Sequence, residues 1–191
     1  MSGLVKLLAF AATGVALGYF SSQYMARGGP LTEVRTLGAW KVWPQAGSSD
    51  ATPYSRLHFL SSGQLPPSHF NRLDFEATHD DEGRRLDSSC SYRLEGNRPE
   101  SRWWALSLHP ESGGDGDRRA QMRELPSNGA IYRPDGSLRI SIDRLARPGN
   151  WLAAPSGGSF VLILHLFNDT PLTREKLLSA APLRIIREDC S

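Results

Sequence analysis

The feature that most constrains this chain is a charge-free stretch near its amino terminus. After Lys6 no charged residue occurs before Arg27, and a helix of that length spans about 30 Å, the thickness of a membrane's hydrocarbon core. The strongly apolar part ends at Phe20. Two interpretations stay open: a retained transmembrane anchor over residues 1–27, which we favour, and a secretory signal cleaved near Ala16-Leu17-Gly18. Both interpretations place the rest of the chain outside the cytoplasm.

An anchor would turn apolar side chains toward lipid along its whole length, among them Leu7, Phe10, Val15, Leu17 and Phe20. The flanking charges decide little about orientation, because Lys6 precedes the span while Arg27 and Arg35 follow it. First helices usually leave the amino terminus inside. We therefore expect a single-pass protein with a cytoplasmic N-terminus and a periplasmic C-terminal domain.

The chain beyond the anchor has the size of one ordinary domain, which we place at residues 38–191 after a linker at 28–37. Its 18 Gly and 13 Pro suit a loop-rich globular fold. The 22 basic and 20 acidic residues are interspersed and leave a formal net charge of +2. Without a basic patch, the sequence gives no reason to expect nucleic acid as a partner.

Short segments rich in β-branched and aromatic residues recur along this domain, bounded by Gly, Pro, Asn or Asp. They predict strands at residues 38–44, 54–60, 73–78, 91–95, 102–108, 129–132, 138–142 and 160–167. The last segment is almost wholly apolar, which indicates a central strand. Only residues 171–181 read as a helix. The sequence therefore predicts a mainly β fold, an antiparallel sandwich or barrel behind one N-terminal helix.

Two cysteines occur, Cys90 and Cys190, and an even count in an exported domain favours one disulfide. The alternative is two unrelated thiols, but Cys190 lies one residue from the end, a poor place for a buried apolar cysteine. The bond would close a loop of about 100 residues and stabilise the fold by somewhat under 5 kcal/mol.

The sequence assigns no catalytic chemistry. The five histidines lack the spacings of metal ligands, so no metal or other cofactor is expected, and Gly-x-Ser-x-Gly does not occur. His165 stands out because it lies in the most apolar predicted strand. It is either a hydrogen-bonded core histidine or part of a site. On this basis enzymatic activity is uncertain and a non-enzymatic protein is favoured.

The tryptophans indicate a surface for binding. Trp103 and Trp104 are adjacent in a predicted strand and must point to opposite faces, so one of them leaves the core. An exposed tryptophan suits an interface, although a covering loop would explain it equally well. Asn150 and Trp151 follow a Pro-Gly turn and are expected to close one end of the fold. The candidate binding residues are Trp103, Trp104, Asn150, Trp151 and His165.

Five motifs together resemble the bacterial domain-of-unknown-function 1214 (DUF1214) family, in particular its short membrane-anchored version. They are Gly38-Ala-Trp-Lys-Val-Trp-Pro44, Cys90-Ser-Tyr-Arg-Leu-Glu-Gly96, Trp103-Trp-Ala-Leu-Ser-Leu108, Arg133-Pro-Asp-Gly-Ser-Leu138 and Pro148-Gly-Asn-Trp-Leu152. The resemblance covers residues 38–190. It implies a jelly-roll-like β-sandwich at the bacterial inner membrane and a companion domain, DUF1254, fused or separate. It implies no established activity.

The chain departs from the family pattern at two places. Where relatives have Leu-Arg-Leu-Tyr, this chain has Leu164-His165-Leu166-Phe167, and where they have Leu-Tyr-Asp it has Leu108-His109-Pro110. We expect a membrane-anchored protein that binds another envelope component, such as the companion domain. The alternative is a periplasmic carbohydrate-binding or hydrolytic enzyme, with a pocket inside the sandwich lined by tryptophan and His165 or His109. Convergent Asp, Glu or His would favour the enzyme, and a flat exposed aromatic patch would favour the binding protein.

Overall fold

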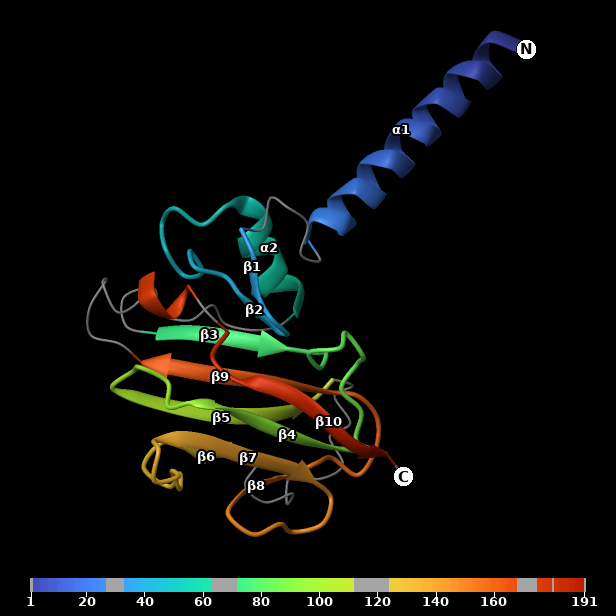
Figure 1. The fold of residues 1–191 in the computed structure, drawn as a ribbon. Coiled ribbons are helices and arrows are strands. Elements are labelled where there is room, and N and C mark those ends of the chain that lie inside the picture. Colours follow the sequence, from blue (N-terminus) through green and yellow to red (C-terminus); the bar gives the residue numbers. More distant parts are fainter. Residues whose placement is uncertain are drawn as a thin grey trace. The chain divides into compact units, whose positions relative to one another are not determined.

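The computed structural model describes residues 2–26, 33–62, 72–111, 124–167, 175–179 and 181–190. The chain divides into two compact units, each described here by itself. The first comprises Met1–Val34 and Gln45–Pro66 and contains the helices α1 (Ser2–Ala26) and α2 (Pro53–Ser62). The second comprises Arg35–Pro44 and Pro67–Ser191 and contains all the described strands (Figure 1).

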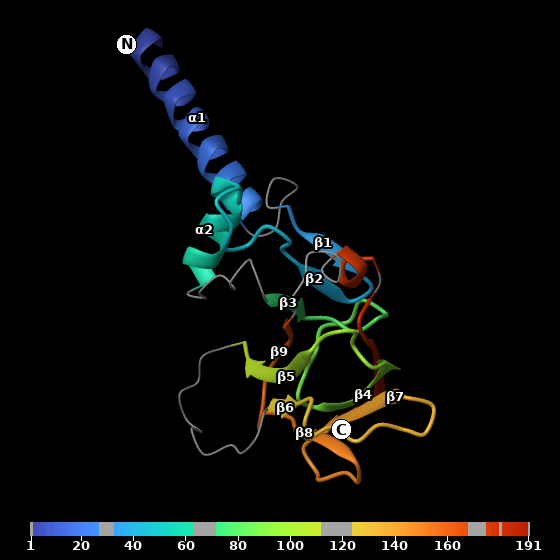
Figure 2. The same cartoon turned by 90° about the vertical axis from the view of Figure 1, so that its left-hand side faces the viewer.

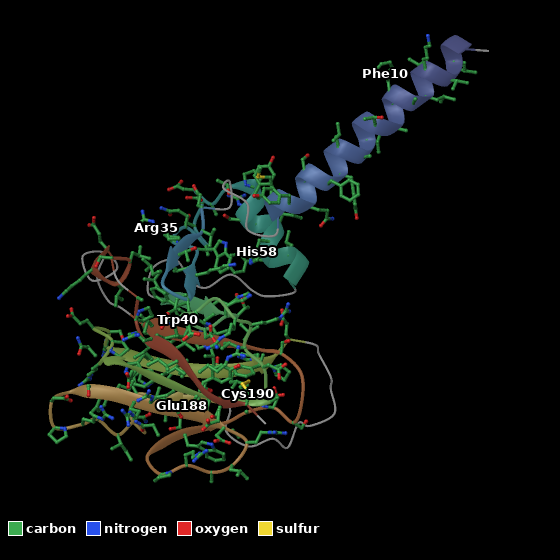
Figure 3. All side chains as sticks on the ribbon, turned by 45° about the vertical axis from the view of Figure 1, so that its right-hand side comes forward. Phe10, Arg35, Trp40, His58, Glu188 and Cys190 are labelled. Atoms are coloured by element: carbon green, nitrogen blue, oxygen red, sulfur yellow. A yellow bond between two sulfur atoms is a disulfide. The ribbon has the colours of Figure 1, made fainter. Side chains whose placement is uncertain are left out.

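Helix α1 carries the apolar stretch at the amino terminus. Its residues Gly3–Met25 have a mean hydropathy of 1.6 and none of their most apolar stretch is buried. The five residues expected to face lipid are between 66% and 79% exposed: Leu7, Phe10, Val15, Leu17 and Phe20. Figure 3 shows side chains projecting from this helix on all sides. Among the described residues, α1 is the one helix long and apolar enough to cross a membrane.

Helix α2 corrects the strand expected at residues 54–60. Thr52 is its N-cap, because the Thr52 hydroxyl accepts a hydrogen bond from the Ser55 backbone N–H at 3.2 Å. Pro53 occupies the first helical position, where its missing N–H costs nothing. Ser55 and Phe59, four residues apart, form the buried side. The Thr-Pro start signal outweighs the aromatic content that suggested a strand.

The larger sheet has six strands and is antiparallel throughout. Its order is β1 (Arg35–Leu37), β2 (Trp40–Val42), β3 (Arg72–Ala77), β9 (Phe160–Phe167), β5 (Trp103–Pro110) and β6 (Glu124–Pro126). The apolar segment expected to be central is β9, which pairs with β3 on one side and β5 on the other. Strands distant in sequence thus become neighbours at β9.

The smaller sheet has four strands, in the order β10 (Arg184–Cys190), β4 (Cys90–Asn97), β7 (Ser137–Asp143) and β8 (Asn150–Ala153). Its β7 and β8 run parallel, so this sheet is mixed. The two sheets share one hydrophobic core, and Figure 2 shows them end-on as two layers. Tyr92 of β4 packs edge-on against Phe160 of β9 across this core, with ring centroids 5.6 Å apart. The mainly β, sandwich-like fold is confirmed.

Alternating burial explains why these segments became strands. In β3 the core side chains are Leu73, Phe75 and Ala77, and in β7 they are Leu138, Ile140 and Ile142, as their spacing predicts. In β9 the side chains of Phe160, Leu162, Leu164 and Leu166 enter the core, while the alternate ones are half-buried on the other face. One face of β9 therefore remains available for other roles.

Three predictions from sequence need correction or completion. Residues 129–132 form no strand, because Asn150 binds both the N–H and the carbonyl of Ile131 and so replaces a neighbouring strand. Strands β1, β6, β8 and β10 were not expected, because β1, β6 and β8 have only three or four residues each and β10 is an edge strand with mostly polar residues. Of the helix expected at 171–181, residues 175–177 form a helical turn, and 171–174 and 180 lie outside the described residues.

The expected disulfide is confirmed between Cys90 of β4 and Cys190 of β10, 100 residues apart in sequence. Figure 3 shows it as a yellow bond beside the label of Cys190. It joins the last described strand of the chain to the middle of the smaller sheet. Because Trp40 also donates its indole N–H to the Leu183 carbonyl at 2.6 Å, the segment leading into β10 is held from both sheets.

Candidate functional site

The face of the six-stranded sheet that points away from the core carries a cluster of polar side chains; we call it the outer face. It displays alternate residues of three adjacent strands: Arg72, Asp74 and Glu76 of β3; Val161, Ile163, His165 and Phe167 of β9; Trp103, Ala105, Ser107 and His109 of β5. The register places His165 directly between Asp74 and Ala105. Ser107 lies two residues further along β5, opposite Ile163 of β9.

Three of these side chains form a continuous line across the strands. The Asp74 Oδ1 atom is 2.8 Å from Nδ1 of His165. The Nε2 atom of the same imidazole is 3.1 Å from the Ser107 hydroxyl oxygen. These are the contacts that join an acid, a base and a nucleophile in serine hydrolases, an arrangement recognised by geometry rather than by sequence order.

A second histidine meets the same hydroxyl. The Nε2 atom of His109 is 3.0 Å from Ser107 Oγ. A serine hydroxyl donates one hydrogen bond and accepts up to two, so it can accept from His109 while it donates to His165. The carbonyl oxygen of Ile163, 3.3 Å away, is the other acceptor within reach of the Ser107 hydroxyl.

Arg72 fixes the acid end of the line. Its Nε and Nη2 atoms each lie 2.7 Å from one oxygen of Asp74, a bidentate ion pair. Burial acts to raise the pKa of Asp74, but hydrogen bonds from His165 and Arg72 outweigh it and hold that pKa below its ordinary value. Asp74 is therefore the carboxylate that stays ionised on this face.

Glu76, two residues further along β3, behaves in the opposite way. Its pKa is raised above the ordinary value, mainly by burial, with the negative charge of Glu111 adding to the effect and Lys41 opposing it. The outer face thus carries two carboxyl groups with pKa values moved in opposite directions. Such pairs are a feature of acid–base sites.

The side chains of the Asp74–His165–Ser107 line are partly shielded from water. Ser107 is 6% exposed, and the side chains of His165, Asp74 and Arg72 are 17%, 20% and 34% exposed. Ion pairs and hydrogen bonds are stronger in such surroundings than in water. Fixed charges and dipoles there also stabilise a charge that develops on a reacting group more strongly than they would in water.

The structure brings two of the five candidate binding residues to this face. His165 is the centre of the line, and Trp103 lies at its edge, half-buried, with its ring centroid 5.0 Å from that of Phe167. Arg72 lies over the Phe167 ring at 5.7 Å. Trp103 and Phe167 thus form a half-buried aromatic pair at the edge of the polar site.

The other three candidates lie elsewhere. Trp104 is fully buried in the core, where its indole N–H donates to the Tyr132 hydroxyl at 3.1 Å. Asn150 is buried in the smaller sheet and caps backbone groups of Ile131 and Arg139, as expected for a capping asparagine. Trp151 is half-buried and donates to the Asp143 carbonyl at 3.0 Å. These contacts give all three residues a structural role.

The polar site is also on the opposite side of the sheet from the one expected. The sequence suggested a pocket between the two sheets, lined by His165 or His109. The space between the sheets instead holds the apolar core, and both histidines lie on the outer face. Among the described residues no group of three or more His, Cys, Asp or Glu is placed to hold a metal ion.

Sequence reasoning missed Asp74, Ser107 and Arg72 as members of a site. Alternation of Asp74 with apolar Leu73 and Phe75 places it on the polar side of β3, but nothing local indicates that β9 pairs with both β3 and β5. The sequence did contain one signal that pointed to this site. Each of the two motifs that depart from the pattern of the family that the chain resembles contains a histidine, His109 or His165, and both histidines contact the Ser107 hydroxyl.

The comparisons with known proteins show the family, support the fold through one solved structure, and leave the activity open. Residues 71–171, just over half of the chain, match the family described as "Protein of unknown function (DUF1214)". The chain therefore belongs to the DUF1214 family. No curated protein sequence matches it.

Two of the similar solved structures come from Vibrio parahaemolyticus and Burkholderia cenocepacia. The crystal structure of the VPA0106 protein from Vibrio parahaemolyticus aligns with a TM-score of 0.61 and 16% sequence identity, over 96% of this chain and 46% of that chain. An uncharacterized protein from Burkholderia cenocepacia aligns with a TM-score of 0.44 and 20% identity, over 65% of this chain and 31% of that one. The first likeness supports the fold. This chain spans about half the length of that relative.

Proposed function

We propose that this chain is an exported, membrane-tethered hydrolase that cleaves acyl esters with Ser107 as its nucleophile. The observation that carries the proposal is the line from Asp74 through His165 to Ser107, with contacts of 2.8 and 3.1 Å. Convergent Asp, His and Ser on a half-buried face meet the criterion for an enzyme better than that for a binding surface, since the exposed aromatic patch expected of the latter is here a half-buried pair.

The reaction follows from the roles of these groups. The Ser107 oxygen attacks the ester carbonyl carbon while its proton passes to Nε2 of His165. The carbon–oxygen bond to the alcohol then breaks, and His165 returns the proton to the departing oxygen. Water then attacks the acyl carbon and gives one proton to His165. The bond from that carbon to the Ser107 oxygen breaks, His165 returns the proton to this oxygen, and the acid is released. Asp74 remains ionised throughout and stabilises the imidazolium ion.

We assign to His109 the stabilisation of the oxyanion that forms on the substrate's carbonyl oxygen, which would lie next to the attacking Ser107 oxygen. With a proton on Nε2 it is a side-chain donor 3.0 Å from the attacking oxygen. Histidine is one of the side chains that serve in oxyanion holes. Backbone N–H groups around Ser107 belong to a strand paired on both sides, so a side-chain donor suits this position better.

One competing arrangement uses the same atoms without catalysis. If the proton of His165 lies on Nε2, Arg72 can donate to Nδ1 across 2.9 Å, and the Ser107 hydroxyl donates to the Ile163 carbonyl. The proton on Nδ1 is favoured because it gives a charge-assisted bond to Asp74, while Arg72 already has both oxygens of Asp74 as partners. The two arrangements differ in which imidazole nitrogen is protonated.

The proposal predicts that Ser107 reacts with a fluorophosphonate probe and that small p-nitrophenyl esters are hydrolysed. Full-length protein in detergent would be labelled, digested and mapped by mass spectrometry. Ser107→Ala should abolish labelling, and His165→Gln or Asp74→Asn should slow it by about 10³-fold or more. The matched control is Ser91→Ala, which removes a serine of the smaller sheet and should leave labelling unchanged.

Unlabelled Ser107 in folded wild-type protein would overturn the proposal, as would equal esterase activity in wild type and Ser107→Ala. Thermal unfolding of each variant separates loss of activity from loss of fold. Nitrogen NMR of histidine-labelled protein provides a second measurement, because the mechanism requires an unprotonated Nε2 on His165.

The tether is part of the proposal. We place α1 in a bacterial inner membrane with its N-terminus in the cytoplasm and the β-domain in the periplasm. The apolar length of α1 and the Cys90–Cys190 disulfide, a bond of oxidising compartments, support this location.

A second candidate function is binding of a companion protein of the envelope, such as a separate DUF1254 chain. It is favoured by the lengths of the similar structures, because this chain aligns almost completely with less than half of VPA0106. A separate chain would then provide what the longer protein carries in one polypeptide. An unreactive Ser107 would leave this candidate as the better one.

A further inference from the structure

Helix α2 has two sides with different surroundings. Ser55 and Phe59 are 2% and 7% exposed and form the buried side. Leu57 and Leu60, three residues apart, are 40% and 79% exposed, and half-buried Tyr54 precedes Leu57 by one turn. Outside α1, four large hydrophobic side chains of the described residues are exposed, and two of them lie on this ten-residue helix.

The neighbour of α2 in the first compact unit is α1. The two helices contact each other, and both views place α2 beside the carboxyl-terminal end of α1 (Figures 1 and 2). Near that end α1 exposes Tyr19 and Tyr24, at 60% and 66%. Tyrosine is enriched where a transmembrane helix leaves the hydrocarbon core and enters the headgroup layer. A helix in contact with this end of α1 therefore lies at the level of the membrane surface.

We infer that α2 is an interfacial helix whose Tyr54, Leu57 and Leu60 side enters the lipid surface from which α1 emerges. The inference rests on the tether described above and is independent of any reaction at Ser107. Transfer of the exposed Leu57 and Leu60 side chains from water into the acyl boundary is favourable by the hydrophobic effect. The occupant of this surface is thus lipid.

The test uses full-length protein in vesicles of phosphatidylethanolamine and phosphatidylglycerol. A photoreactive p-benzoylphenylalanine replaces Leu60 in one variant. In the matched control it replaces Leu145, a leucine with similar exposure, 73%, in the second compact unit. Irradiation should give lipid adducts at position 60, with only background at position 145.

Background adducts at position 60 would overturn the inference, and so would adducts to a second copy of the chain, which would make the surface a protein interface. Intact mass measured beforehand shows whether α1 is retained. A chain without α1 overturns the tether itself, a result separate from failure of α2 alone.

Amide exchange supplies a second measurement. In vesicles, Leu57→Gln with Leu60→Gln should speed exchange of α2 amides by about tenfold or more, because burial of each leucine is worth more than a factor of ten. In the same protein, exchange of β9 amides should not change. Equal α2 exchange in wild type and variant would contradict a lipid contact.

Discussion

At the scale of single residues, Asp80 illustrates how this domain accommodates a buried charge. Its side chain has no exposed surface, and its oxygens accept hydrogen bonds from the backbone N–H groups of Glu82 and Arg84 and from the side chains of Arg84 and Arg187. Burial acts to raise the pKa of Asp80, but these hydrogen bonds and the charge of Arg187 hold it below the ordinary value. The carboxylate thus joins the turn after β3 to β10.

We predict that Asp80→Asn lowers the free energy of unfolding by about 3–5 kcal/mol at neutral pH, because it leaves Arg187 without its buried partner. Since the folded-state pKa lies below the unfolded value near 3.9, this stabilisation is complete above that pH and is lost as the pH falls through the folded pKa. Urea titrations of full-length protein in detergent, at neutral pH and at about pH 3, would measure the difference.

The control for this prediction is Asp50→Asn, which changes an exposed carboxylate and should have little effect at either pH. A gap between wild type and Asp80→Asn that stays constant from neutral to acid pH would contradict the assignment of the stabilisation to the charge.

At the scale of elements, strand β10 depends on contacts formed far from it in sequence. It pairs with β4 alone, its burial decreases toward the end of the chain, and the disulfide fixes its last residue. Asp81 adds a clamp at the other end, where its side chain accepts from the Ile185 N–H at 2.8 Å and its own N–H donates to the Ile185 carbonyl at 3.1 Å.

Replacement of both cysteines, Cys90→Ala with Cys190→Ala, should lower the free energy of unfolding by up to about 4.7 kcal/mol, the chain-entropy value for a 100-residue loop. Amide exchange should accelerate first at the last residues of β10, while the residues clamped by Asp81 stay protected. Dithiothreitol treatment of wild-type protein is the control and should reproduce both effects. Unchanged stability would show that the bond contributes nothing beyond the strand contacts.

The elements also show what local sequence determines. Residue content predicted β3 and β7 to within one residue at each end, and an almost wholly apolar run predicted β9 at its observed bounds. Edge strand β10 has no such pattern, because few of its side chains reach the core, and β8 is too short to show one. Helix α2 was not predicted although Thr52-Pro53 is a helix start signal. Its ten residues bury only one narrow side, so they show no clear helical pattern of apolar residues.

At the scale of the whole molecule, the location of the domain is the property that most needs measurement. We predict that alkaline phosphatase fused after Ser191 is active in cells while a fluorescent protein at the same place is dark, because the disulfide and α1 both suit a periplasmic domain. The chain should remain in the membrane pellet after an alkaline wash. An active phosphatase in the soluble fraction would instead indicate a cleaved signal.

The candidate site also belongs to this scale. Sequence could place Asp74 and His165 on strands and could assign Asp74 to the polar side, but the pairing order that joins β3, β9 and β5 is set by packing of the complete core. Residues that lie nearly a hundred positions apart in the chain and become cross-strand neighbours produce no recognisable local pattern in the sequence. His165 was singled out for its apolar surroundings, and Ser107 was not, because one serine in a strand carries no signal of its own.

The central place of β9 has a consequence for the order in which the protein matures. A chain that crosses a membrane in sequence order presents β3 and β5 well before β9 arrives to pair with both. Until then two strands expose unpaired backbone edges, which are sites of aggregation, and closure of such non-local pairings is slow. We therefore predict that, on the proposed export route, folding of the domain depends on holdase chaperones more than its modest size suggests.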